Sequence, residues 1–185
     1  MTKKYFFRDK LNYNDYKRFP DDRMIHEIIN GKHYNHPAPR PKHQRISRNL
    51  DLVFGSYVMK NQLGEWLSAP IDVLLGEHDI VQPDKVFISK ENANIITELN
   101  IQGVPDLIIE ITSPIDPGYD RETKMSLYSK YKVKNYWILD AQLDVLEVYK
   151  YSRKGYELAG KYRKGDIFKP KIFKGLKVNM NTVLV

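Results

Sequence analysis

A short apolar run interrupted by a single acid constrains the fold of this chain more than any other feature. The run from Leu107 to Ile111 contains Glu110 and lies between Pro105 and Pro114, which limits it to the length of a strand. Nearly continuous apolar runs of this length are typical of strands that are buried on both faces of a sheet. The run therefore predicts a central strand whose two faces are covered by other elements.

Hydrophobic periodicity predicts strands and two main helices around this central strand. One helix is expected from about Pro41 to Tyr57 and the other from about Asp120 to Tyr131, each with an apolar stripe at helical spacing. A short opening helix is expected from Asn12 to Phe19. Strands are expected at 26–29 and 32–34 around Asn30-Gly31, and at 66–67, 71–75, 81–88, 107–111, 136–139, 145–151, 156–162 and 176–178. We expect one α/β domain of the α+β type over residues 1–185, with a mixed central sheet flanked by two main helices.

The composition excludes several classes of protein. The chain has no cysteine, which rules out disulfide frameworks, thiolate metal sites and cysteine nucleophiles. No segment approaches the roughly 18 consecutive apolar residues of a membrane span, and residues 1–8 lack the apolar run of a signal peptide. We therefore expect a cytoplasmic protein with no membrane partner.

Positive charge is concentrated near the carboxy terminus. Residues 150–185 contain ten Lys or Arg and two acidic residues, a net charge of +8, whereas the whole chain carries +7. A basic segment beside a nearly neutral body is what a surface that faces a polyanion would show. The alternative is a lysine-rich face that is simply solvated, and composition alone does not decide between them.

Two acids lie within strand-like runs and form a candidate metal site. An ionised Glu110 in its apolar strand costs several kcal/mol unless it is paired or binds a cation. Asp84 follows Pro83, which has no amide proton and suits the start of a strand or a bulge. Two such oxygen ligands on neighbouring strands, together with a backbone carbonyl, suit Mg²⁺. Taken singly, each acid could instead be an ordinary strand-end residue that reaches a cation or solvent.

Lys124 shares the apolar stripe of the second helix. It lies three, four and seven residues before Leu127, Tyr128 and Tyr131, so its side chain should point toward the sheet. A lysine in that place either extends its ammonium to solvent or meets buried acids. Beside metal-bound carboxylates it could orient an attacking water or stabilise charge on a phosphate.

Other polar residues are weaker candidates. Glu27 alternates with apolar residues in its expected strand and could join the acid cluster. His43, with Lys42 and Arg45, could contact phosphate from the first helix, although a locally bonded helix-end histidine is the more ordinary case. Asp106 is expected to cap the start of the central strand, and the strand acid Asp72 has no evident partner.

Several short stretches, in this order and spacing, resemble the Uma-two family of restriction-endonuclease-like proteins, a branch of the PD-(D/E)XK nuclease superfamily. The resemblance extends from about Asp15 to Val183. It rests on Glu27 to Gly31, Pro37 to Pro39 with His43 to Ser47, Ala69 to Val73, Val81 to Asp84, Gly103 to Pro114, Asp120 to Tyr128 and Val133 to Asp140.

The resemblance implies a restriction-endonuclease-like fold in which Asp84 and Glu110 bind Mg²⁺. Such nucleases usually carry a lysine two residues after the glutamate, but Thr112 occupies that position here. Lys124 matches the relocated lysine of variant sites, and Glu27 matches the amino-terminal glutamate that can complete them.

The leading hypothesis is a Mg²⁺-dependent endonuclease that hydrolyses phosphodiester bonds of nucleic acid, with DNA as the expected substrate and Mn²⁺ as an alternative metal. Asp84, Glu110 and the carbonyl of Ile111 would hold the metal, Lys124 would act on the attacking water or the phosphate, and a homodimer could cut two strands. Thr112 favours a rival, a catalytically inactive module that binds nucleic acid or a protein partner. A third hypothesis, a metal-dependent hydrolase of small phosphorylated substrates, fits the basic segment less well.

Overall fold

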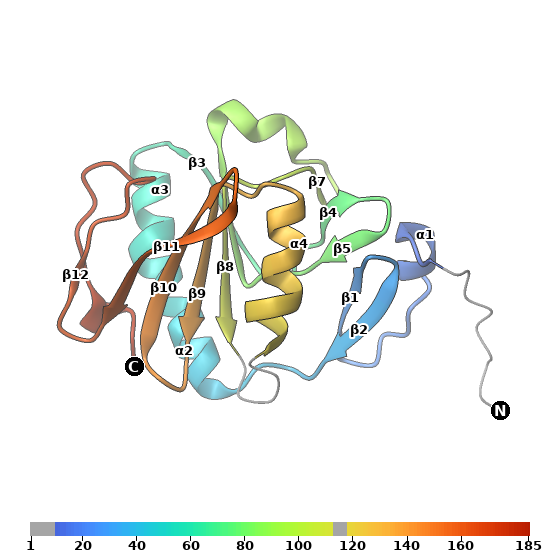
Figure 1. The fold of residues 1–185 in the computed structure, drawn as a ribbon, viewed down its shortest axis with the longest axis horizontal. Coiled ribbons are helices and arrows are strands. Elements are labelled where there is room, and N and C mark those ends of the chain that lie inside the picture. Colours follow the sequence, from blue (N-terminus) through green and yellow to red (C-terminus); the bar gives the residue numbers. More distant parts are fainter. Residues whose placement is uncertain (1–9, 113–117) are drawn as a thin grey trace.

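The structure is a computed structural model that describes residues 10–112 and 118–185. In these ranges the chain forms two β-sheets and a small ribbon (Figure 1). The larger sheet has the strand order β11 (Gly155–Arg163), β10 (Val145–Ser152), β9 (Asn135–Asp140), β8 (Leu107–Thr112), β6 (Lys85–Ser89), β3 (Gly64–Ser68). The second sheet has the order β2 (Lys32–His36), β1 (Ile25–Ile29), β5 (Asp79–Val81), β4 (Val73–Gly76), β7 (Ile101–Gln102).

Strand β8 lies inside the larger sheet, as its apolar run predicts. All six of its residues are buried. It runs parallel to β9 and antiparallel to β6, so the sheet is mixed. Because side chains alternate along a strand, Ile109 enters one hydrophobic core and Ile108 the other. Glu110 therefore belongs to the face of Ile108.

A helix covers each face of this sheet, which confirms the expected two main helices. On the Ile109 face, α2 (Pro41–Leu50) continues through a π-helical turn (Asp51–Gly55) into α3 (Ser56–Lys60). On the Ile108 face, a π-helical turn (Tyr119–Lys124) leads into α4 (Met125–Lys130). Glu110 thus faces the helix that carries Lys124.

The expected hairpin forms at Asn30-Gly31, between β1 and β2. The φ angles of these two residues are 52° and 77°, the left-handed values that a two-residue hairpin turn requires. Asn12 caps the opening helix α1 (Tyr13–Tyr16) through a reciprocal capping box with Asp15, and this helix is shorter than predicted.

The single strand expected at 81–88 is wrong, because the chain divides there between the two sheets. β5 ends at Val81 in the five-stranded sheet and β6 begins at Lys85 in the six-stranded sheet. The connection is Gln82-Pro83-Asp84, in which Pro83 offers no amide proton to a strand partner. Asp84 therefore lies where the two sheets meet.

The carboxy-terminal part adds elements that the sequence indicated only in part. The strand expected at 176–178 is β13 (Val178–Asn179), which pairs with the unpredicted β12 (Ile167–Phe168). Short 3₁₀ turns occupy Lys90–Ile95 and Met180–Thr182. No helix within the described ranges is long and apolar enough to cross a membrane.

Candidate active site

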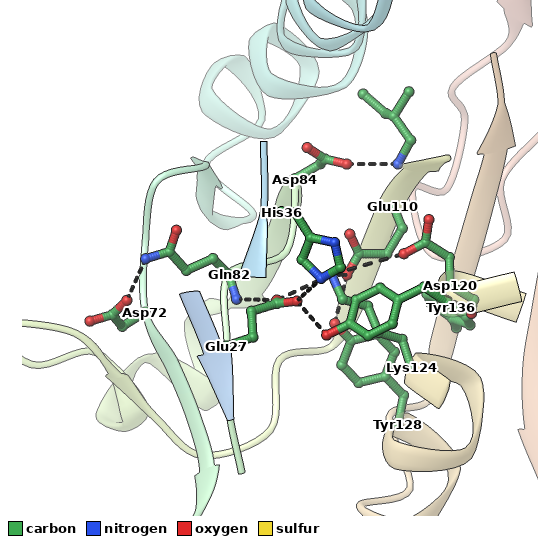
Figure 2. Close-up of polar contacts among 12 residues, drawn as sticks. Glu27, His36, Asp72, Gln82, Asp84, Glu110, Asp120, Lys124, Tyr128 and Tyr136 are labelled. Carbon is green, nitrogen blue, oxygen red and sulfur yellow. Dashed lines mark hydrogen bonds and ion pairs between the residues drawn. The ribbon is translucent and has the colours of Figure 1, made fainter. Parts of the chain in front are cut away.

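Glu110 is held by two donors from the helix opposite its strand. Its side chain is nearly inaccessible, and Oε1 accepts hydrogen bonds from the Lys124 Nζ at 3.0 Å and the Tyr128 hydroxyl at 2.6 Å. Figure 2 shows these side chains converging from β8 and from the helix. The unusual acid of the apolar strand is thus paired, as the energetic argument required.

Asp84 lies beside Glu110, so the two acids expected on neighbouring strands are brought together. Its Oδ2 accepts the backbone N–H of Ile111 at 2.7 Å. His43, at the start of α2, places Nε2 3.1 Å from both carboxylate oxygens. Both acids line a cavity of about 710 Å³.

Lys124 is the cation at the centre of the site. Its Nζ lies 3.0 Å from Glu110, 3.2 Å from Glu27 and 3.9 Å from Asp120. Burial lowers the pKa of this ammonium, but the charges of Glu110, Glu27 and Asp120 outweigh that effect and hold the pKa well above its ordinary value. The Lys124 ammonium therefore pairs with buried acids and does not extend to solvent.

Glu27 brings the second sheet into the same cluster. From β1, its Oε1 accepts the backbone N–H of Gln82 and its Oε2 accepts the Tyr119 hydroxyl, each at 2.7 Å. The His36 Nε2 lies 3.7 Å from Oε2. Together with the ion pair to Lys124, these contacts surround a carboxylate that is 1% exposed.

Negative charge exceeds positive charge in this cavity. Among the described residues, the four acids Glu27, Asp84, Glu110 and Asp120 line it together with the three cations Arg40, Lys42 and Lys124, of which Lys124 alone is buried. Burial raises the pKa of Glu110 well above its ordinary value; Lys124 opposes this, and the charges of Asp120, Asp84 and Glu27 add to it. An excess of carboxylates in a partly enclosed cavity favours the entry of a further cation.

The donor set suits a hard cation better than zinc. Asp84, Glu110 and the carbonyl of Ile111 offer oxygen ligands, which Mg²⁺ and Mn²⁺ prefer. No group of three or more His, Cys, Asp or Glu side chains in the described ranges is arranged to hold a metal ion as it stands. A metal here would therefore rely on two carboxylates, the carbonyl and retained water, which is typical of Mg²⁺.

The expected phosphate-contacting residues differ in their placement. Lys42 lines the cavity, but its Nζ pairs with Asp144 at 2.8 Å. His43 bonds to Asp84 and so has a partner within the site. Arg45 is exposed and does not line the cavity.

The remaining acids have structural partners. Asp106 accepts the backbone N–H of Ser89 at 2.9 Å, so its carboxylate satisfies the end of β6 and not the start of its own strand. Asp72 accepts hydrogen bonds from the Tyr16 hydroxyl at 2.6 Å and the Gln82 side chain at 2.9 Å. Thr112 is buried at the end of β8 and lines the cavity where many nucleases carry a lysine.

Sequence reasoning missed three residues of the site. Asp120 lies one helical turn before Lys124, so helical spacing could have placed it beside the lysine. Tyr128 was assigned only to the apolar stripe, although a buried tyrosine hydroxyl usually needs a partner. Tyr119 carried no signal in the sequence, because its bond to Glu27 joins residues far apart in the chain.

Comparisons with known proteins show the family and the fold of the chain. The family model described as "Uma2: Putative restriction endonuclease" matches residues 13–181. A crystal structure described as "a putative nuclease belonging to DUF820 from Anabaena variabilis ATCC 29413" has a similar fold, with a TM-score of 0.75 at 18% sequence identity over 94% of this chain and 97% of that chain. None of the curated proteins matches the chain. Because the family model spans most of the sequence, this protein belongs to the Uma2 family.

Proposed function

We propose that this protein is a metal-dependent nuclease that hydrolyses phosphodiester bonds in nucleic acid, with DNA as the preferred substrate. The observation that carries the proposal is the approach of Lys124 to Glu110, 3.0 Å away, beside Asp84 in one cavity. The ammonium that many nucleases place two residues after the glutamate would here come from the following helix. Thr112 at the usual position is then compatible with activity.

The chain's own residues would divide the chemistry among them. Asp84 and Glu110, with the carbonyl of Ile111, would hold Mg²⁺ or Mn²⁺, which when bound lowers the pKa of water and neutralises charge on a phosphate. Lys124, whose pKa is raised, would remain an ammonium and stabilise the negative charge that develops on the scissile phosphate. Glu27 would keep Lys124 in place through its 3.2 Å ion pair.

Basic residues near the cavity would guide the polyanion. Arg40 and Lys42 line the cavity, and Lys164 lies 3.7 Å from Asp144, the partner of Lys42. The basic carboxy-terminal segment thus comes close to the cavity rim at this point. Contacts of this kind supply affinity that is independent of sequence and falls with salt.

Cleavage of plasmid and single-stranded DNA with Mg²⁺, Mn²⁺ or EDTA tests the proposal, with Glu110→Gln as the variant. Glutamine keeps the size of the side chain and an oxygen for Tyr128 but removes the charge. We expect metal-dependent cleavage by the wild type and a loss of at least about 100-fold in the variant, the scale of removing one electrostatic catalytic group.

Glu122→Gln is the matched control, because Glu122 is an exposed acid on the helix of Lys124. It should cleave like the wild type. Salt-sensitive DNA binding without cleavage by the wild type would contradict the proposal and favour the rival, a catalytically inactive binding module.

A further inference from the structure

Asp120 is held differently from the other three carboxylates of the cavity. Glu27, Asp84 and Glu110 each accept at least two hydrogen bonds or close ion-pair contacts. The Asp120 carboxylate accepts no hydrogen bond from any described residue, and its closest cation is the Lys124 ammonium at 3.9 Å. Figure 2 shows this carboxylate turned toward Glu110 and Lys124. One acid of the site thus keeps its acceptor capacity free.

The position of Asp120 is nevertheless fixed by its surroundings. Its side chain is 10% exposed, and its backbone carbonyl accepts the buried Tyr136 hydroxyl at 2.9 Å. Helical spacing holds it on the same face as Lys124, one turn away. A buried carboxylate without donors is costly, and water in the cavity is the donor that would satisfy it.

Hydrolysis of a phosphodiester is accelerated by a group that takes a proton from the attacking water. Lys124 is unsuited because the surrounding acids keep it an ammonium. His43 is also unsuited, because its Nε2 bonds to Asp84 and its Nδ1 is buried, where a water in the cavity cannot reach it. Asp84 and Glu110 are the proposed metal ligands, and both oxygens of Glu27 are bonded. Among the carboxylates that line the cavity, these assignments leave Asp120.

We infer that Asp120 is the general base of the proposed nuclease and that its carboxylate orients and deprotonates the attacking water. The inference rests on the proposed function. The water oxygen forms a bond to phosphorus while its proton passes to a carboxylate oxygen of Asp120. The bond from phosphorus to the leaving oxygen breaks, and that oxygen keeps the electron pair and takes a proton from solvent. Asp120 then releases its proton to solvent.

The electrostatics of the cavity agree with this role. Burial raises the pKa of Asp120 to about 6; Lys124 and His43 lower it, and the charges of Asp84 and Glu27 raise it further. The charge of Asp120 in turn raises the pKa of Glu110. A carboxylate with such a pKa is ionised at neutral pH and a stronger base than an exposed aspartate, which suits proton transfer near pH 7.

The test is Asp120→Asn, with Glu122→Gln as the matched control on the same helix. Asparagine keeps the shape but cannot take the proton. We expect kcat on an oligonucleotide to fall by about 10²–10⁴, with KM and the affinity for Mn²⁺, measured by calorimetry without substrate, unchanged. The acidic limb of the wild-type pH profile of kcat should disappear in Asp120→Asn. Asp120→Glu keeps a carboxylate and should restore part of kcat.

Thermal unfolding without metal distinguishes catalysis from a structural role. Asp120→Asn removes a poorly compensated buried charge, so its Tm should equal or exceed that of the wild type. Unchanged kcat, or a loss of kcat matched by a loss of Mn²⁺ affinity, would overturn the inference while leaving the nuclease proposal intact. A wild type that does not cleave would overturn both.

Discussion

Replacing Lys124 by methionine tests the ion network at the centre of the site. Methionine fills similar space but leaves Glu27, Glu110 and Asp120 without the ammonium that lies 3.0–3.9 Å from them. Removing one partner of a buried ion pair costs ~3–5 kcal/mol. In a chain of this length each kcal/mol lowers Tm by about 2–4 °C, so a decrease of about 6–20 °C is expected at pH 8.

The loss should depend on pH in a defined direction. Burial raises the pKa of Glu110, and that of Asp120 from 3.8 to about 6, so the folded state binds these protons more tightly than the unfolded state. Stability contributed by such acids is therefore lost as pH rises through their folded pKa values. Without Lys124 both pKa values should rise further, so the deficit should be largest at pH 8 and smaller at pH 5.

Thermal and urea unfolding of wild type, Lys124→Met and Lys134→Met at both pH values measures this effect. Lys134 is the matched control, because its side chain is 79% exposed and its Nζ lies 3.8 Å from Asp106. Its replacement should cost no more than about 1 kcal/mol. If Lys124→Met loses no more stability than the control at pH 8, or loses as much at pH 5 as at pH 8, the ion network does not stabilise the fold in this way.

Two further predictions concern residues outside this network. Asp51→Ala should destabilise the fold by about 1–2 kcal/mol in urea unfolding, because it leaves the buried Lys85 ammonium without the half-exposed carboxylate that lies 2.7 Å away. Asp51→Asn keeps an oxygen for Trp66 and should lose less stability; equal losses would contradict the charge argument. Lys42→Gln should weaken DNA binding, measured by fluorescence anisotropy, and should reduce the slope of the logarithm of the binding constant against the logarithm of the salt concentration by about 1. An unchanged slope would show that Lys42 remains paired with Asp144 in the complex.

The central strand, its acid Glu110 and the facing lysine Lys124 could be predicted from local sequence patterns. Glu110 stood out because its neighbours are apolar, and Lys124 because a lysine occupied an apolar helical stripe. Each signal depends only on the residue pattern within a single strand or helix, and such a pattern can be seen directly in the sequence. Asp120 also lies on that helix, but an acid near a helix start is common, so its burial could not be recognised without the packed sheet.

Residues joined across the two sheets could not be predicted in this way. Tyr119 and Glu27 are 92 positions apart, and their bond depends on how the second sheet is placed. The division of the expected strand at 81–88 could not be predicted, because the residues on both sides of the break, Val81 and 85–89, belong to strands. Arg45 was grouped with His43 by proximity in sequence, although on a helix two residues apart the side chains point in different directions.

The division at Gln82-Pro83-Asp84 explains why the site forms where it does. The connection leaves the sheet of Glu27 at Val81 and enters the sheet of Glu110 at Lys85. Gln82 donates its backbone N–H to Glu27, and Asp84 accepts the backbone N–H of Ile111. The three-residue connection from Gln82 to Asp84 is therefore bonded to both sheets. Substitution of Asp84 should therefore disturb the alignment of the sheets as well as any metal site. Activity lost with Asp84→Ala alone would not separate these roles, whereas Glu110→Gln leaves this connection between the sheets untouched.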